Sequence, residues 1–231
     1  MSSVNQFVYV NGTTTYVYGA GGAIPNIPIT GAPADTNFRR FAMLNDGTTY
    51  RMYFFKGSTN NMLYQFGFNG ASYAYGHNSI PVLTLTHIPA DADLSSFGML
   101  WDPSTSAYRL YGRRLGAPEV LYQAAYVPGS TNYQFGYNSI PAIPVTGFPH
   151  DTDWSRWNML HDGSAYRIYT MKLGSNITLY QGSYNPAATA YQYAHNSIPV
   201  LTLQGTPANS NLGMFAMAYG QSAYRFYFQT L

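Results

Sequence analysis

The stretch Tyr50-Arg51-Met52-Tyr53 carries the strongest architectural signal in this chain, because the pattern Tyr-Arg-apolar-Tyr returns three more times, at residues 108–111, 166–169 and 224–227. The first Tyr of each copy is residue 50, 108, 166 or 224, so successive copies lie 58 residues apart. A constant offset of this length is the signature of a repeat architecture.

Other markers recur around each tetrad in a fixed order. An aromatic-x-Met pair precedes the tetrad in every copy, at Phe41 and Met43, Phe97 and Met99, Trp157 and Met159, and Phe215 and Met217. Leu-Tyr-Gln begins at Leu63, Leu121 and Leu179, and an Ile-Pro step begins at Ile24, Ile80, Ile140 and Ile198. Several markers in one order indicate that the whole unit is repeated, and not only the tetrad.

Each repeat is typical of short strands separated by turns. In the first copy we expect strands at 41–44, 50–55 and 63–68 and a fourth beginning at 73, with turns at Asp46-Gly47 and Asn69-Gly70. No stretch of useful length has the i, i+3, i+4, i+7 periodicity of a helix. Four antiparallel strands per repeat predict the blade of a β-propeller.

The two ends of the sequence fit together. The fourth copy stops after its Tyr-Arg strand, whereas residues 7–12 and 16–19 resemble residues 64–70 and 73–76 of the first copy. We therefore predict an all-β, four-bladed propeller built from four repeats of about 58 residues, whose last blade is closed by N-terminal strands. As one domain over 1–231, it divides into closing strands at 1–25 and repeats at 26–81, 82–141, 142–199 and 200–231.

The run Tyr50 to Gly57, with a Pro-Asp segment before the inner strand, resembles the blade pattern of hemopexin-like propellers. The resemblance covers the repeat spacing of the whole chain but few residue identities. The Asp-Ala-Ala start of that family's inner strand is replaced here by Phe41-Ala42-Met43-Leu44, and no Cys is present to link the first and last blades. The resemblance implies the blade geometry and does not imply heme binding.

The composition narrows the function classes. Only 9% of residues are charged, 17% are aromatic, and the net charge of +2 is far from a nucleic-acid-binding pattern. Zero Cys excludes disulfides and Cys-based zinc sites. No secretion signal opens the chain and no apolar stretch is long enough for a transmembrane helix, so we expect a leaderless cytoplasmic protein.

The repeated arginines are the first candidate site residues: Arg51, Arg109, Arg167 and Arg225. Strand alternation places each on the face opposite its preceding Tyr, where neighbouring blades meet. Asp35, Asp91 and Asp151 recur after the approach Pro and are candidate partners. Two interpretations stay open: a structural tie between blades, or an Arg that lines a repeated ligand pocket.

The second candidate set precedes the Ile-Pro step: His77 and Asn78, Tyr137 and Asn138, and His195 and Asn196. Asn and Ser also favour turns, so a loop-capping role competes with ligand contact. The change from His to Tyr at one position argues against a ring of metal ligands, and no catalytic motif is present. Trp101, which we place at a turn, completes the candidate ligand-binding residues.

Repeated sites rich in Tyr, Asn, Gln and Ser with few charges favour recognition of neutral ligands such as sugars. We predict a multivalent, lectin-like carbohydrate-binding protein, non-enzymatic and without cofactor or metal, whose partners are glycans or glycoproteins. The alternatives are a protein-interaction or storage propeller, or a hemopexin-like binder of heme or another apolar ligand. Whether copies associate into a homo-oligomer is left open by the sequence.

Overall fold

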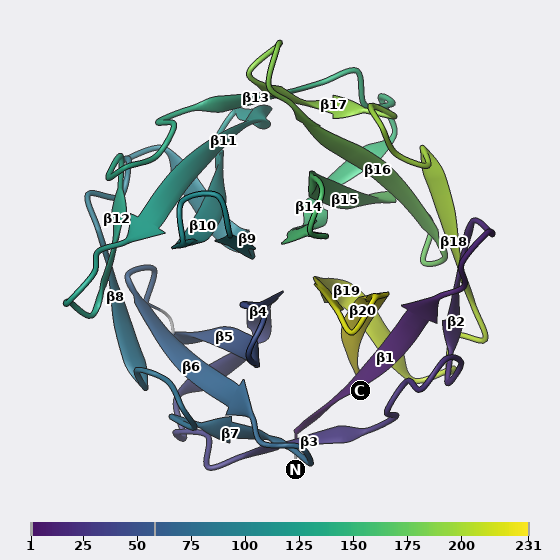
Figure 1. Cartoon of the computed structure of the whole chain (residues 1–231), viewed down its shortest axis with the longest axis horizontal. Helices are drawn as coiled ribbons and strands as arrows, with labels where there is room; N and C mark the ends of the chain where they lie inside the picture. The colour runs from purple at the N-terminus through teal and green to yellow at the C-terminus, as the bar shows by residue number, and fades with distance from the viewer. Residues whose placement is uncertain (1, 58, 231) are drawn as a thin grey trace.

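The strands of this protein form a ring around a central axis, which is the architecture of a β-propeller (Figure 1). The computed structural model describes residues 2–57 and 59–230, and within these ranges it contains twenty β-strands and no helix. The predicted all-β propeller is therefore confirmed.

Three long strands pair in antiparallel order in each of four units. The strands nearest the axis are β4 (Thr36–Asn45), β9 (Ala92–Asp102), β14 (Thr152–His161) and β19 (Ser210–Gly220). The middle strands are β5 (Tyr50–Lys56), β10 (Ala107–Arg114), β15 (Tyr166–Lys172) and β20 (Ala223–Thr230). The third strands are β6 (Met62–Phe68), β11 (Ala117–Tyr126), β16 (Thr178–Asn185) and β1 (Ser3–Tyr9).

Two short strands share the outer edge of every unit. The first of each pair is β7 (Tyr73–Tyr75), β12 (Asn132–Phe135), β17 (Ala190–Tyr193) or β2 (Thr15–Tyr18). The second is β8 (Val82–Thr86), β13 (Ile143–Thr146), β18 (Val200–Gln204) or β3 (Ile27–Thr30). Strands β7 and β8, for example, both pair with β6. The expectation of one outer strand per repeat is therefore incomplete.

The short outer strands also join neighbouring units. They pair in parallel as β3–β7, β8–β12, β13–β17 and β18–β2, and we call these eight strands the outer belt. Each junction between units is thus bridged by main-chain hydrogen bonds in addition to side-chain packing.

The ring is closed by the two ends of the chain. Strand β1 pairs with β20 in antiparallel register from Val4 opposite Gln229 to Val8 opposite Arg225. The predicted pairing of N-terminal strands with the last repeat is confirmed.

The hydrophobic core is divided into four clusters, one at each junction between units. Phe55 of the first unit meets Phe97 of the second edge to face, with ring centroids 4.9 Å apart. The four repeated methionines, Met43, Met99, Met159 and Met217, are fully buried. Trp157, which replaces the Phe of the other copies, is also buried in the core, as expected.

Candidate ligand-binding pockets

Four cavities lie at the four junctions between units, and they are lined by equivalent positions of the repeat. Their volumes are about 340, 400, 250 and 260 Å³ in the order first–second, second–third, third–fourth and fourth–first unit. Every cavity contains one tetrad Arg, namely Arg51, Arg109, Arg167 or Arg225. The first three also contain Asn78, Asn138 or Asn196 of the second candidate set.

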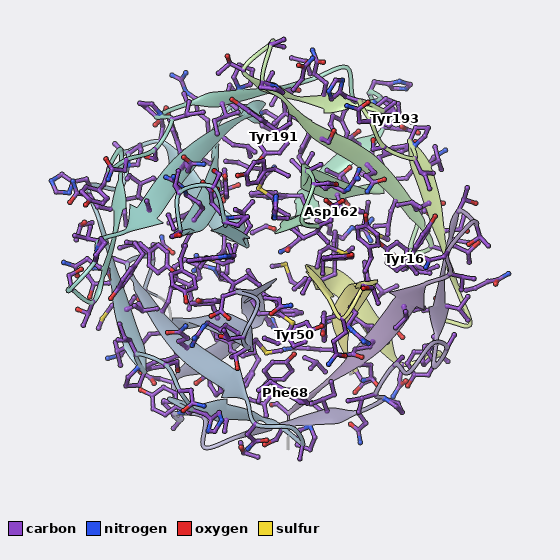
Figure 2. All side chains as sticks on the ribbon, viewed as in Figure 1. Tyr16, Tyr50, Phe68, Asp162, Tyr191 and Tyr193 are labelled. Carbon is purple, nitrogen blue, oxygen red and sulfur yellow. The ribbon has the colours of Figure 1, made fainter. Side chains whose placement is uncertain are left out.

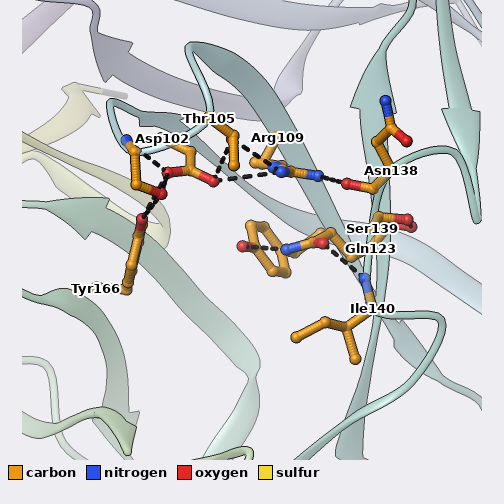
Figure 3. A network of polar contacts seen from close by, with 10 residues as sticks. Asp102, Thr105, Arg109, Gln123, Asn138, Ser139, Ile140 and Tyr166 are labelled. Carbon is orange, nitrogen blue, oxygen red and sulfur yellow. Dashed lines mark hydrogen bonds and ion pairs between the residues drawn. The ribbon is translucent and has the colours of Figure 1, made fainter. Parts of the chain in front are cut away.

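The pocket between the second and third units shows how the Arg is held (Figure 3). Arg109 is 6% exposed, and its guanidinium donates to the Asp102 carboxylate at 3.3 Å and to the main-chain carbonyl of Asn138. Asp102 ends β9, and it also accepts a hydrogen bond from the Tyr166 hydroxyl of the next unit at 2.5 Å. Arg109 therefore connects the hairpin turn at Asp102 with the loop at Asn138, and Asp102 connects both with the neighbouring unit.

Two further pockets repeat this arrangement. Arg51 donates to Asp46 at 2.6 Å and to the carbonyl of Asn78 at 2.7 Å, and Tyr108 of the second unit donates to the same carboxylate at 2.9 Å. The third pocket has Arg167 and Asp162 in the same roles. These contacts support the structural-tie interpretation of the three arginines, which at the same time line the cavities.

The aspartates of these ties are firmly ionised. Burial acts to raise the pKa of Asp46, but hydrogen bonds from Thr48 and Arg51 outweigh it and hold the pKa at about 2. The pKa of Asp102 is also about 2, and that of Asp162 is lowered as well, because hydrogen bonds again outweigh burial. Each of the three pockets therefore contains a balanced cation and anion.

The prediction that Asp35, Asp91 and Asp151 are the partners of the repeated arginines was wrong. Asp35, Asp91 and Asp151 accept hydrogen bonds from the hydroxyls of Tyr64, Tyr122 and Tyr180 at 2.7, 2.8 and 2.8 Å. Asp91 and Asp151 also pair with Arg114 and Lys172, not with the tetrad arginines. The true partners lie in the hairpin turn just before the tetrad. From the sequence, the Asp-Gly pair at 46–47 was interpreted only as a turn.

The three repeated asparagines lie at the pocket rims. Asn78, Asn138 and Asn196 are exposed and have positive φ values of 46°, 39° and 43°, a conformation that Asn tolerates better than most residues. Their carbonyls accept from the tetrad arginines, so the loop-capping role is present. The three residues are exposed, and each is part of the lining of its pocket.

The other candidates lie outside the three pocket walls. His77 and His195 are half-buried, and each is within hydrogen-bond distance of the amide of the Asn that follows it. Tyr137 lines a separate cavity on the far side of the Asn138 loop. Trp101 was expected at a turn, but it lies in β9 and packs on Tyr108 with ring centroids 4.7 Å apart.

A repeated Gln contributes to every pocket and was not among the predicted site residues. In the second pocket Gln123 donates to the Tyr111 hydroxyl and accepts from the Ile140 amide at 3.0 Å. Equivalent positions are Gln65, Gln181 and Gln6. The Leu-Tyr-Gln marker located three of these glutamines, but a regular strand pattern gives no sign of which side chain faces a cavity.

Four tyrosines line each of the first three pockets. Tyr111, Tyr166, Tyr184 and Tyr191 surround the second pocket, and equivalent tyrosines surround the first and third. Tyr111 and Tyr191 meet nearly perpendicularly, at 87°, with ring centroids 6.4 Å apart. Each pocket thus offers aromatic surface beside amide, hydroxyl and guanidinium groups.

Residues 2–57 and 59–230 contain neither a candidate metal site nor a candidate membrane-spanning helix. No group of three or more His, Asp or Glu side chains in these ranges is placed to hold a metal ion. Likewise, no helix with the length and apolar character needed to cross a bilayer occurs in the described part of the chain.

Neither a protein-family model nor a curated protein matches the sequence. Among solved structures, SapL1 lectin in complex with α-methyl fucoside aligns with a TM-score of 0.37 at 12% identity, over 84% of this chain and 56% of that one. A variant of the Aleuria aurantia lectin with α-methyl-L-fucoside gives 0.37 at 13%, over 98% and 62%. The same lectin, described as a six-bladed β-propeller, gives 0.34 at 18%, over 89% and 54%.

The present chain therefore spans less than two thirds of the length of these lectins. All three TM-scores lie below 0.5.

Proposed function

We propose that this protein is a multivalent, lectin-like carbohydrate-binding protein whose sites are the pockets between its units. The observation that carries the proposal is the recurrence of one constellation of Tyr, Arg, Gln, Asn and Ser in three separate cavities. The first and second pockets, of about 340 and 400 Å³, lie at the lower end of the range of about 300–1,000 Å³ for small-molecule sites, and the third, of about 250 Å³, lies just below it.

The chemistry of the walls suits a neutral sugar. Aromatic rings such as Tyr184 and Tyr191 offer apolar faces to the C–H groups of a pyranose. The exposed amide of Asn138 and the hydroxyl of Ser139 offer donors and acceptors to sugar hydroxyls. Since Arg109 and Asp102 neutralise each other, an uncharged ligand meets no unpaired charge in this pocket.

The same contacts argue for binding without catalysis. A general acid or base is most effective when its pKa lies near the operating pH, whereas the pKa values of Asp46 and Asp102 are held at about 2. These carboxylates accept several hydrogen bonds each and are committed to holding the turns.

We further propose that the four units are the four blades of one propeller domain over residues 1–231. The pairing of β1 with β20 and the circular outer belt support this assignment. The resemblance to hemopexin-like propellers stays a prediction about blade geometry.

The test is a sugar titration by calorimetry against a panel of neutral monosaccharides that includes methyl α-fucoside, with agglutination of erythrocytes as the readout of multivalency. We expect weak binding at each site and agglutination that free sugar reverses, because avidity multiplies weak sites. Stepwise replacement of Asn78, Asn138 and Asn196 by Gly keeps the positive φ and removes only the amide, so binding should fall in steps at constant melting temperature.

The proposal would be refuted if correctly folded protein bound no sugar in the titrations, did not agglutinate erythrocytes and bound no glycan on an array. A protein-interaction role would then take its place. A change in the Soret band on hemin titration would instead favour the binder of an apolar ligand.

A further inference from the structure

The pocket between the fourth and first units differs from the other three in its charge. Its Arg is Arg225, but the hairpin turn before β20 has no Asp. Gly220 follows Tyr219, the residue opposite Tyr224, just as Asp162 follows the residue opposite Tyr166. Gly220 therefore occupies the position of the missing carboxylate.

Arg225 has only neutral partners. It is 8% exposed, and its guanidinium lies 3.3 Å from the side-chain oxygen of Gln6 and 3.5 Å from that of Gln221. In the part of the chain that the structure describes, no carboxylate lies within 4.0 Å of Arg225. Burial of a guanidinium without a counter-charge costs free energy, and in this pocket the positive charge of Arg225 is not neutralised by a carboxylate.

A second group in this pocket also has no partner. The buried Tyr50 hydroxyl makes no hydrogen bond to any described residue, whereas its counterparts Tyr108, Tyr166 and Tyr224 donate to the aspartates of the other pockets. A Cβ atom on Gly220 would lie 2.3 Å from the Tyr50 hydroxyl oxygen. A carboxylate side chain at position 220 therefore has no room, and this position supplies no counter-charge to Arg225.

The turn that removes the carboxylate is itself strained. Gln221 and Ser222 form a two-residue connection with φ values of 52° and 58°, in positions where Asn and Gly are preferred. Backbone strain of this kind persists where the surrounding structure maintains it, commonly at ligand sites. Here it directs the Gln221 side chain toward Arg225.

We propose that this fourth pocket binds a carboxylate-bearing saccharide of the hexuronate class. The carboxylate accepts from the Arg225 guanidinium, in the geometry that Arg favours for carboxylates, and from the Tyr50 hydroxyl. Phe68 and Tyr73 provide apolar surface for the sugar ring in a cavity of about 260 Å³. Figure 2 places Tyr50 and Phe68 together at this junction. The saccharide part of the assignment rests on the proposed function, and the carboxylate part rests on this pocket alone.

The experiment titrates the full chain with D-glucuronate, D-glucose and acetate, by calorimetry and by NMR of the arginine Nε–Hε groups. We expect D-glucuronate to bind more tightly than either other probe and to shift the Arg225 signal. Tyr50→Phe removes one hydrogen bond to the charged group and should weaken D-glucuronate about tenfold. The matched variant Tyr122→Phe, whose hydroxyl donates to Asp91 outside the pockets, should leave this affinity unchanged within twofold.

Arg225→Gln should abolish D-glucuronate binding. If this variant fails to fold, the inference is tested by the effect of Tyr50→Phe on D-glucuronate affinity. Absence of D-glucuronate binding while neutral sugars bind elsewhere would overturn this inference and leave the proposed function intact. Binding of D-glucuronate with no neutral sugar bound at any pocket would support the inference and contradict the proposed neutral-sugar function. Equal affinity for acetate and D-glucuronate would overturn the saccharide assignment.

Discussion

Replacement of Asp162 by Asn tests whether the Arg–Asp ties hold the units together. The Asp162 side chain is 1% exposed and accepts hydrogen bonds from Arg167, from the Tyr224 hydroxyl at 2.8 Å, and from Ser164 and Ala165 in its own turn. Arg167 and Tyr224 both donate to the same oxygen, Oδ2. An Asn can keep its oxygen toward the turn, but it then points an NH₂ group at two donors.

The expected loss of stability can be estimated from the interactions that Asp162→Asn removes. Breaking a buried ion pair on one side costs about 3–5 kcal/mol, and a hydrogen bond to a charged group contributes about 1.5–3 kcal/mol. The Arg167 side chain is 13% exposed and keeps its bond to the Asn196 carbonyl, so part of this cost is relieved by solvent. We expect Asp162→Asn to lower the free energy of unfolding by about 2–4 kcal/mol at pH 7 and the melting temperature by about 5–15 °C.

The pH dependence gives the sharper readout. The pKa of Asp162 is lowered in the folded state, so its stabilising contribution is complete above the unfolded-state pKa, near 4, and is lost as the pH falls. The difference in the free energy of unfolding between wild type and Asp162→Asn should therefore be constant from pH 6 to 8. At pH 3 this difference should be smaller by about 1 kcal/mol.

The assay is urea unfolding at several pH values, with Asp151→Asn as the matched control. Asp151 makes the same kind of contacts with Tyr180 and Lys172, but its pair is 29% and 44% exposed, so we expect a clearly smaller loss of stability than for Asp162→Asn. Equal losses in the two variants, or a difference for Asp162→Asn that does not change between pH 7 and pH 3, would refute the role of the buried tie.

Three further changes probe the backbone and the ring closure, each measured as the shift in urea midpoint. Asn138→Ala should lose about 1 kcal/mol because Ala disfavours φ of 39°, whereas Asn138→Gly should stay within about 0.5 kcal/mol; equal losses would contradict this. Gly182→Ala places a Cβ 2.6 Å from the Gln192 carbonyl and should lose about 1–3 kcal/mol, clearly more than Gly213→Ala, whose Cβ meets only the side-chain oxygen of Asn211, at 3.1 Å. Phe7→Ala empties a fully buried site where β1 meets β20 and should lose about 3–5 kcal/mol; a loss below 1 kcal/mol would mean that this junction is loosely packed.

Much of the architecture could be predicted because the repeat imposes the same strand pattern four times. The strands expected at 50–55 and 63–68 correspond to β5 at Tyr50–Lys56 and β6 at Met62–Phe68. The second outer strand of each unit was missed because it has four or five residues and includes or follows a Pro, which weakens any strand signal. Its pairing depends on a neighbouring unit, and such partners cannot be read from a local pattern.

The sequence indicated several residues that line the candidate pockets, but it did not indicate which residues contact one another there. The repeated arginines and asparagines line the cavities, whereas the aspartate partners were assigned to the wrong loop. Asp35 and Asp46 are both near a strand end in the sequence, and only the hairpin geometry brings Asp46 to 2.6 Å from Arg51. The absence of an Asp before Arg225 was visible in the sequence, but its meaning required the position of the Tyr50 hydroxyl.

The pairing of β1 with β20 also sets the order of events during synthesis. Strand β1 is made before β20, which contains residues 223–230, so the edge of β1 that faces β20 stays unpaired while three whole units are made, although its other edge can pair with β2 and β3. During that interval its main-chain groups are open to wrong partners, including the edge of another nascent chain. Bringing the two strands together closes a loop of almost the full chain length, whose entropic cost grows only with the logarithm of that length. Delay in translating the last repeat is therefore a more serious hazard for this protein than the size of the loop it must close.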